Sequence, residues 1–419
     1  MIETTTLDNG LRVVVGHRPG HVVYCGLAVD AGTRDQLDNE SGMAHFIEHM
    51  SFKGTERRKA WHIINRMEAV GGDLNAYTGK EHTVYYCSCL RQHLGRAIDL
   101  LFDITFHSTY PQHELEKEVE VVCDEIESYN DSPAELIYDD FENFIFPGHP
   151  LGRRILGDAD RLRQYRSEDL QRFVHRLYHP SRTVLFVLGD ITMKQVLRIG
   201  KEWKTESVER SGNHSGGALR QENRPSSLSS PFSSLPSHYE KAFSTHQAHV
   251  ILGARAFAKD DPRYMALYLL NNLLGGPGMN ARLNLALRER RGLVYTVESS
   301  LTAYTDIGLW TTYFGCDHKD VDRCLHLIRH ELQRLAEAPL STSALAAAKR
   351  QLQGQAALSW ENGENVAIAM GCRLLHLGRT QTLPDFCQAV DEVTATQILD
   401  VAQQIFSPDN LFTLRYVNK

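Results

Sequence analysis

The hydrophobic residues of this chain follow two different periods. Short runs rich in β-branched residues, at 10–15, 22–29 and 249–253, predict β-strands. Longer stretches in which hydrophobic residues recur every three or four positions, such as 266–274 and 343–359, predict amphipathic helices. Both kinds of element occur in both parts of the chain. This pattern predicts the α+β class, with antiparallel or mixed sheets and helices on one face.

A segment rich in serine, proline and glycine, residues 206–239, separates two regions of similar size. Such a composition cannot bury enough hydrophobic surface to fold alone, so we expect a mobile or extended linker. The flanking regions, 1–205 and 240–419, each finish with a helix end, a proline turn and a strand, at 178–188 and 405–414. We therefore predict two homologous, α/β-sandwich-like halves.

One predicted helix carries two histidines and a glutamate in the order His45-Phe46-Ile47-Glu48-His49. Residues four apart lie on the same face of a helix, so His45 and His49 can bind one metal ion, with Glu48 beside them. This order is the inverted form of a common zinc-peptidase box. A histidine buried on an apolar face rarely needs a second one at helical spacing, and we therefore favour a zinc site. The second half has no such pair.

The residues around this box predict the bounds of its helix. Its apolar side consists of Met43, Phe46, Ile47 and Met50. Candidate N-caps precede these residues at Asp38, Asn39 and Ser41, and a natural stop follows at Gly54.

A zinc site needs a third protein ligand, and an acidic helix predicted at 114–128 offers candidates. Its hydrophobic stripe consists of Leu115, Val119, Val122 and Ile126. This stripe leaves Glu118 and Glu125 seven residues apart on a neighbouring face. Spacing alone does not choose between these two carboxylates, and charged helix faces commonly serve only to solvate a surface.

The composition is that of a globular protein long enough for two cores. The chain has 419 residues, 42% hydrophobic and 23% charged. A net charge of −7 and the lack of a long basic run argue against a nucleic-acid partner. No segment has the length of a signal peptide or a membrane span, so we expect no membrane partner and a cytoplasmic location. None of the eight cysteines forms a Cys-x-x-Cys box, and Cys87 and Cys89 are expected to be small buried residues of one strand.

Over nearly its whole length the sequence resembles the pitrilysin/insulinase-type inverzincin metallopeptidases. It is most similar to their short two-domain branch, which includes the mitochondrial processing peptidase β subunit and its bacterial relatives. The resemblance rests on residues 6–11, 42–55, 71–78, 118–133, 148–152, 274–283 and 288–295.

The resemblance implies one Zn²⁺ per chain, bound by His45, His49 and Glu125. It implies that Glu48 is the general base that takes a proton from the attacking water, and that Glu118 is an acid that positions the site. Loss of Glu48 should then abolish turnover and spare metal binding.

The resemblance also implies residues that bind substrate. It suggests that Arg288 and Tyr295 reach over from the second half to bind substrate carbonyls or the developing oxyanion. Asn75 and Ala76 fall where the family has an edge strand that pairs with the substrate backbone. Without the resemblance, these four residues indicate a helix-surface arginine, a core tyrosine, a turn and a strand. Pro277 departs from what is usually an all-glycine stretch and puts the geometry of that loop in doubt.

The expected function is therefore that of a zinc endopeptidase whose two halves face each other across a cavity. Its substrates would be peptides or unfolded polypeptide segments. Members of the short branch work as homodimers or as heterodimers with a related subunit, so we expect a partner of one of these kinds. Two alternatives are a non-catalytic or partner-dependent subunit, and a metalloenzyme that acts on a non-peptide amide.

Overall fold

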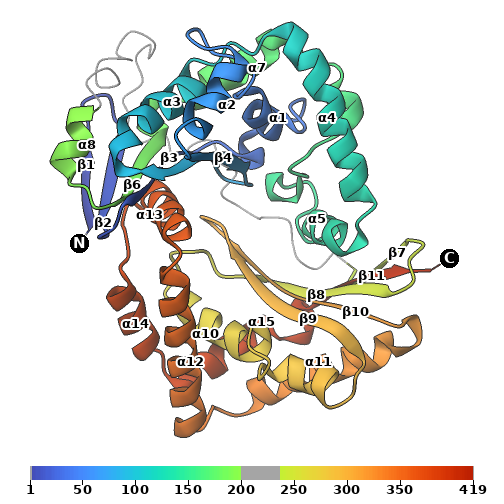
Figure 1. Ribbon diagram of the computed structural model, residues 1–419. Helices are drawn as coiled ribbons and strands as arrows, with labels where there is room; N and C mark the ends of the chain where they lie inside the picture. The colour runs from blue at the N-terminus through green and yellow to red at the C-terminus, as the bar shows by residue number, and fades with distance from the viewer. Residues whose placement is uncertain (1, 200–235, 419) are drawn as a thin grey trace. The chain divides into compact units, whose positions relative to one another are not determined.

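The computed structural model describes residues 2–199 and 236–418 (Figure 1). Most of the predicted linker, residues 206–235, lies outside this range. Contacts divide the described residues into two compact units. Unit one comprises 2–127, 153–199 and 359–382, and unit two comprises 128–152, 236–358 and 383–418.

Unit one is built on a six-stranded sheet in the order β1-β2-β6-β3-β5-β4. The strands are β1 (Ile2–Thr6), β2 (Arg12–His17), β3 (Val22–Val29), β4 (Asp73–Thr78), β5 (Thr83–Leu90) and β6 (Thr183–Gly189). β2 and β6 are parallel, and the other pairs are antiparallel. The mixed sheet agrees with the prediction, and β3 has the predicted bounds.

Helices cover one face of this sheet and bury alternate strand residues such as Val23, Cys25, Leu27 and Cys87. They are α1 (Met43–Met50), α2 (Ala60–Glu68), α3 (Leu94–Phe106), α4 (Gln112–Asn130), α6 (Ala159–Leu162), α7 (Ser167–Leu177) and α8 (Met193–Ile199). Short η helices of the same unit lie at Thr33–Asp35, Arg91–His93 and Pro180–Arg182, and one of unit two lies at Pro150–Gly152.

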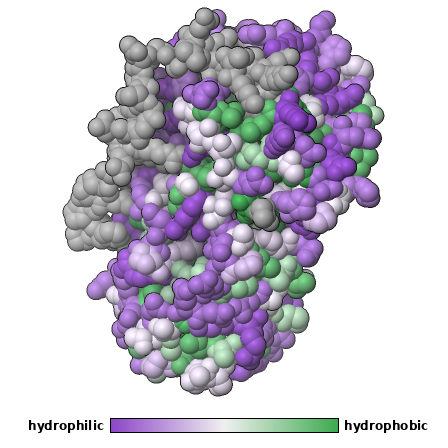
Figure 2. All heavy atoms as spheres, turned by 90° about the vertical axis from the view of Figure 1, so that its left-hand side faces the viewer, coloured by the Kyte–Doolittle hydropathy of each residue, from purple (hydrophilic) through white to green (hydrophobic). Residues whose placement is uncertain are grey.

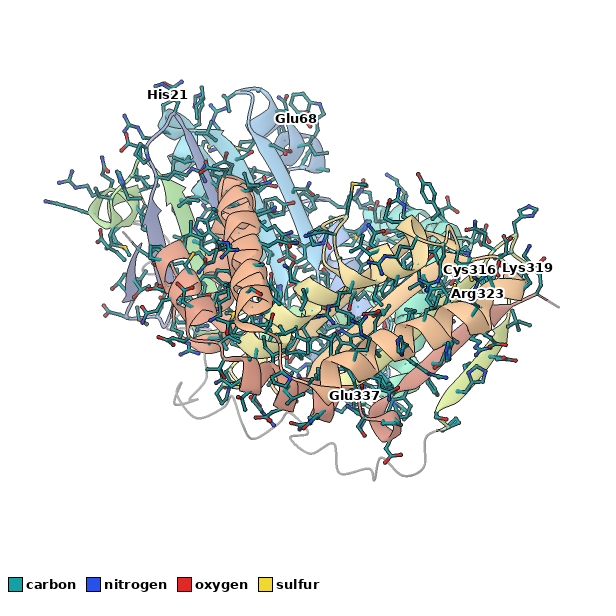
Figure 3. The ribbon with its side chains drawn as sticks, turned by 90° about the horizontal axis from the view of Figure 1, so that it is seen from below. His21, Glu68, Cys316, Lys319, Arg323 and Glu337 are labelled. Carbon is teal, nitrogen blue, oxygen red and sulfur yellow. The ribbon has the colours of Figure 1, made fainter. Side chains whose placement is uncertain are left out.

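Unit two has a five-stranded sheet in the order β7-β11-β8-β10-β9. Its strands are β7 (His238–Ala242), β8 (Ala248–Ala256), β9 (Val294–Ala303), β10 (Gly308–Cys316) and β11 (Phe412–Val417). Its helices are α5 (Pro133–Ile145), α10 (Tyr264–Gly275), η6 (Asn284–Glu289), η7 (His318–Asp320), α11 (Val321–Glu337), α12 (Thr342–Trp360), α14 (Leu383–Asp391), α15 (Ala395–Ile405) and η8 (Pro408–Asn410). Figure 3 shows α11 running from Arg323, with Lys319 of η7 just before the helix, to Glu337 at its other end.

The two sheets share one plan, as the sequence predicted. In both, the order runs from a strand that is parallel to its neighbour through three antiparallel pairings to an edge strand. Thus β2-β6-β3-β5-β4 corresponds to β7-β11-β8-β10-β9. The α+β class and the homologous halves are confirmed.

Each sheet also has a helix on its second face, which the sequence analysis did not predict. α13 (Gly363–Leu377) belongs to unit one and packs against strand residues such as Ala28 and Phe186. α5 belongs to unit two and packs against strand residues such as Ile251 and Leu414. Each unit therefore takes one helix from the opposite half of the sequence, and the central strands β6 and β10 are buried on both faces.

None of the helices among the described residues is long and apolar enough to cross a membrane. On the face in Figure 2, hydrophilic side chains predominate and hydrophobic ones form separate patches. The eight cysteines all lie in the described ranges and form no disulfide, and Cys87 and Cys89 are both buried in β5 as expected.

Candidate metal centre

Helix α1 carries the histidine pair and is fixed by its hydrophobic side. Met43, Phe46, Ile47 and Met50 are all buried in the core of unit one. The helix is only eight residues long, too short to be stable by itself, so packing against the sheet holds it. This packing leaves His45, Glu48 and His49 on the opposite side of the helix.

The beginning of α1 differs from the prediction. The N-cap is Gly42 in a left-handed conformation, with φ of 77°, and none of the predicted caps Asp38, Asn39 and Ser41 caps the helix. The side chain of Gln36 instead accepts a hydrogen bond from the backbone N–H of Ala44 at 3.0 Å. The predicted stop, Gly54, is also wrong, because the helix already ends at Met50. Asp38 pairs instead with Arg153.

Tight backbone packing explains why a glycine occupies this N-cap. A Cβ at Gly42 would lie 2.6 Å from the carbonyl oxygen of Leu156 and 3.1 Å from the Cα of Gly157. Real Cβ atoms essentially never approach another atom as closely as 2.6 Å, and a positive φ disfavours residues other than glycine. The 156–157 loop therefore packs directly against the start of α1.

Helix α4 supplies the carboxylates. Its predicted stripe, Leu115, Val119, Val122 and Ile126, is buried as expected. Glu118 is buried beside this stripe, with its side chain 8% exposed, whereas the side chain of Glu125 is 43% exposed. Both point toward α1 from two turns apart.

His45, His49 and Glu125 converge on one point. Nε2 of His45 is 3.8 Å from one carboxylate oxygen of Glu125, and Nε2 of His49 is 3.5 Å from the other. Two ligands of a tetrahedral zinc site lie about 3.3 Å apart, so these donors fit Zn²⁺ closely. Among the histidine, cysteine, aspartate and glutamate side chains of the described residues, these three form the group whose ligand atoms all lie within 4.8 Å of one another.

The electrostatics of the two histidines differ. Burial lowers the pKa of His45 to about 3, and the charge of His49 adds to this effect. Burial would also lower the pKa of His49, but the hydrogen bond to Glu118 and the nearby carboxylates outweigh it and raise that pKa. His45 is therefore a neutral imidazole at pH 7, with a lone pair available for a metal.

Glu118 holds the ring of His49 from behind. Its Oε1 lies 3.0 Å from Nδ1 of His49, and its Oε2 lies 2.5 Å from Nζ of Lys53. Burial raises the pKa of Glu118, but the hydrogen bonds from His49 and Lys53 more than offset this and lower it overall. A carboxylate at this position orients a ligating histidine and directs its Nε2 toward the metal.

The structure places Glu48 beside this centre and fixes it through β4. The hydroxyl of Thr78, at the end of β4, donates a hydrogen bond to Oε2 of Glu48 at 2.9 Å. Burial raises the pKa of Glu48, although the hydrogen bond from Thr78 and the charge of His49 oppose this shift. Two imidazoles, a carboxylate ligand and a second carboxylate beside them form the arrangement of a hydrolytic zinc centre.

Comparison with known proteins agrees with this geometry. The insulinase model of peptidase family M16 matches residues 12–159, and the model of the peptidase M16 inactive domain matches residues 165–352. A protein of Bacillus subtilis strain 168, named uncharacterized zinc protease YmxG, is 31% identical over 418 residues, which cover 99% of this chain and 98% of the relative. This chain belongs to the insulinase peptidase family. The family inferred from the sequence motifs is confirmed.

Other members of the insulinase family extend this comparison. The mitochondrial-processing peptidase subunit beta of Caenorhabditis elegans is 29% identical over 410 residues, which cover 96% of this chain and 86% of that protein. The crystal structure of a protease from Helicobacter pylori covers 99% of both chains with a TM-score of 0.85 and 22% identity. A Pseudomonas fluorescens structure, described as a peptidase M16 inactive domain, gives a TM-score of 0.87 at 20% identity, covering 100% of this chain and 98% of that one. These two structures support the fold.

Asn75 and Ala76, the predicted substrate-binding residues of this insulinase-family chain, lie in β4. β4 is the last strand of its sheet, so none of the described strands pairs with its outer edge. The side chain of Asn75 accepts a hydrogen bond from the N–H of Ala76 at 2.9 Å. Thr78, the last residue of β4, donates to Glu48 of α1, so the edge strand also holds the carboxylate that is predicted to act as general base.

The structure brings Arg288 and Tyr295 together in unit two. Arg288 lies in η6 and Tyr295 at the start of β9, with the guanidinium carbon 5.7 Å from the centre of the tyrosine ring. Tyr295 is 80% exposed, so the alternative of a core tyrosine is wrong. Its predicted role in binding substrate stays a prediction.

Sequence reasoning missed two residues, Thr78 and Lys53. Both lie inside segments that carried the family resemblance, but neither had a role assigned. Their importance depends on contacts between elements far apart in sequence, Thr78 with α1 and Lys53 with α4. The one clue in the sequence was the two-residue period of β4, which places Thr78 on the same face of the strand as the predicted substrate-binding residue Ala76.

Proposed function

We propose that this chain is a zinc-dependent endopeptidase that hydrolyses peptides or unfolded polypeptide segments. The observation that supports it best is the convergence of His45, His49 and Glu125, with Glu48 held beside them by Thr78. Zinc protease is also the name given to the Bacillus relative. We propose one Zn²⁺ per chain.

The roles proposed for the side chains follow from their contacts. Zinc bound to the three ligands would supply Lewis acidity, activating a water molecule near neutral pH and polarising the substrate carbonyl. Glu48 accepts a proton from the attacking water on one carboxylate oxygen while Thr78 holds the other. Glu48 then delivers that proton to the leaving amine. Glu118 keeps the His49 ring in place throughout.

Substrate would bind as an extended strand along the outer edge of β4, at Asn75 and Ala76. Backbone pairing of this kind requires an unfolded segment, because folded proteins rarely present a strand with unpaired backbone groups. Arg288 and Tyr295 are proposed to bind substrate carbonyls or the developing oxyanion. Both side chains are exposed enough to reach a ligand.

A second candidate is a partner-dependent or non-catalytic subunit. Two observations favour it: one relative is named as a subunit of the mitochondrial-processing peptidase, and the matching model of the second half is described as an inactive domain. A homodimer or a heterodimer with a related subunit therefore remains part of the proposal. A cytoplasmic location, proposed from the sequence, suits eight cysteines without a disulfide.

The test is a mass-spectrometric time course of a mixed peptide pool incubated with purified protein. We expect cleavage by the wild type and by Glu127→Gln, which alters an exposed glutamate two residues from Glu125. Cleavage should be absent with Glu48→Gln and with a chelator. No cleavage by zinc-loaded wild type would refute an enzyme active alone and favour the partner-dependent subunit.

A further inference from the structure

Lys53 has no assigned role, yet it completes a chain of contacts that ends at the metal centre. Its Nζ lies 2.5 Å from Oε2 of Glu118, and Oε1 of the same carboxylate lies 3.0 Å from Nδ1 of His49. The other ring nitrogen of His49 faces Glu125 at 3.5 Å. Lys53 and Glu118 thus lie one after the other behind the ring of His49, on the side away from its metal-binding Nε2.

The backbone fixes the position of Lys53 on both sides. α1 ends at Met50, and the N–H of Lys53 donates to the carbonyl of Met50 at 3.1 Å. On the other side, Gly54 pairs with Lys59 and Thr55 pairs with Ser108 in isolated bridges. The direction of the lysine is therefore set by a defined turn.

The ion pair between Lys53 and Glu118 is stronger because it is partly buried. Surface ion pairs contribute little because water screens them. Here, however, the Glu118 side chain is only 8% exposed and the Lys53 side chain 28%. Without the ammonium group, Oε2 of a buried carboxylate would lose its partner, and leaving a buried charge unpaired is costly. The carboxylate would then rotate or draw in water, and its alignment with His49 would loosen.

The two histidines also differ in whether a side chain contacts the Nδ1 atom of the ring. Within the described residues, Nδ1 of His45 is buried and has no hydrogen-bond partner. His49 is thus the ligand whose ring orientation is controlled by a side chain, and that side chain is itself held by Lys53. Partners behind a metal ligand commonly determine metal affinity.

We propose that Lys53 is a positioning residue of the metal centre, whose ammonium group fixes Glu118 so that Glu118 can hold His49 and slow the loss of zinc. This inference rests on the zinc site of the proposed function. It does not rest on peptide cleavage, so the two can fail separately.

The experiment measures the rate at which zinc-loaded protein transfers its metal to a chromogenic chelator. We expect Lys53→Met to release zinc about 10-fold faster than wild type, the lower end of effects seen for partners behind a ligand. Lys53→Arg keeps the cation and should stay within about threefold of wild type. Lys117→Met is the matched control, since it removes an exposed α4 lysine that pairs with Glu114 at 3.1 Å, and it should change nothing.

Two further measurements separate positioning from general stability. In a Glu118→Gln background, Lys53→Met should add no further acceleration, because Lys53 acts through that carboxylate. In the zinc-free protein Lys53→Met should lower the thermal midpoint, because the buried Glu118 carboxylate loses its partner, and in the Glu118→Gln background it should lower it no further. Release at the wild-type rate, or faster release that persists in the Glu118→Gln background, would overturn the inference. A wild type that binds zinc but cleaves no peptide would refute an endopeptidase active alone and leave this inference standing.

Discussion

The packing of Gly42 allows a quantitative test of what holds helix α1. The perturbation is Gly42→Ala, which adds one methyl group at the N-cap of α1, three residues before His45. Two separate costs follow. Alanine at φ of 77° costs about 1–2 kcal/mol. The methyl group would also meet backbone atoms of the 156–157 loop at 2.6 and 3.1 Å.

The second cost is steric, and another glycine serves as its control. Forcing an extra methyl group into a packed site costs about 1–3 kcal/mol. Gly71 has φ of 71° and nothing within 4 Å of its added Cβ, so Gly71→Ala carries the conformational cost alone. We therefore expect about 1–2 kcal/mol for Gly71→Ala and about 2–5 kcal/mol for Gly42→Ala.

The assay is thermal unfolding of the zinc-free protein, followed by zinc titration. About 1 kcal/mol corresponds to about 2–4 °C for a domain of this size, so Gly42→Ala should unfold several degrees below Gly71→Ala. It should also bind zinc more weakly, because α1 carries two of the ligands, whereas Gly71→Ala should bind zinc normally. Equal midpoints for the two variants would refute the argument that the loop packs against this helix start.

Three other predictions concern the site. Thr78→Val should lower kcat by about 10- to 100-fold with little change in KM, because a hydrogen bond to a charged group is worth about 1.5–3 kcal/mol. Thr78→Ser should remain within about threefold, and a larger effect on KM than on kcat would count against a positioning role. Glu48→Gln should retain zinc, measured by elemental analysis, and show no cleavage; loss of the metal would mean that Glu48 is a ligand. Zinc at 100 times its Kd should stabilise the protein by about 2.7 kcal/mol, visible as a higher thermal midpoint that a chelator reverses. Variant His45→Ala should lose that increase, and its persistence would place zinc elsewhere.

The sequence was sufficient where periodicity determines structure. The stripe of α4 was predicted residue by residue, because a helix that packs on a sheet must bury one face. The same periodicity placed Glu118 and Glu125 on a common face but could not rank them, since their roles depend on how far α4 lies from α1. Only the three-dimensional structure shows one of them facing both Nε2 atoms and the other facing Nδ1 of His49.

Sequence reasoning failed where the deciding contact is distant. The start of α1 depends on a loop more than 100 residues away, and side-chain preference alone favoured polar caps. Similarly, the hydrophobic stripes of α5 and α13 show that each helix packs on something, but not which sheet it covers. Each helix packs on a sheet built mainly from the other half of the sequence, and the local sequence pattern does not indicate which sheet that is.

Under the proposed function, β4 would connect substrate binding with catalysis. Its outer edge lacks a described neighbour, and its last residue, Thr78, donates to Glu48. A strand rises about 3.3 Å per residue, so Ala76 lies about 7 Å along β4 from Thr78, the residue that donates to Glu48. A peptide paired with this edge would therefore lie at a fixed offset from Glu48, whatever its side chains. Under the proposed function, backbone pairing would then determine where a peptide is cut relative to its bound register, and side-chain pockets would determine which peptides bind.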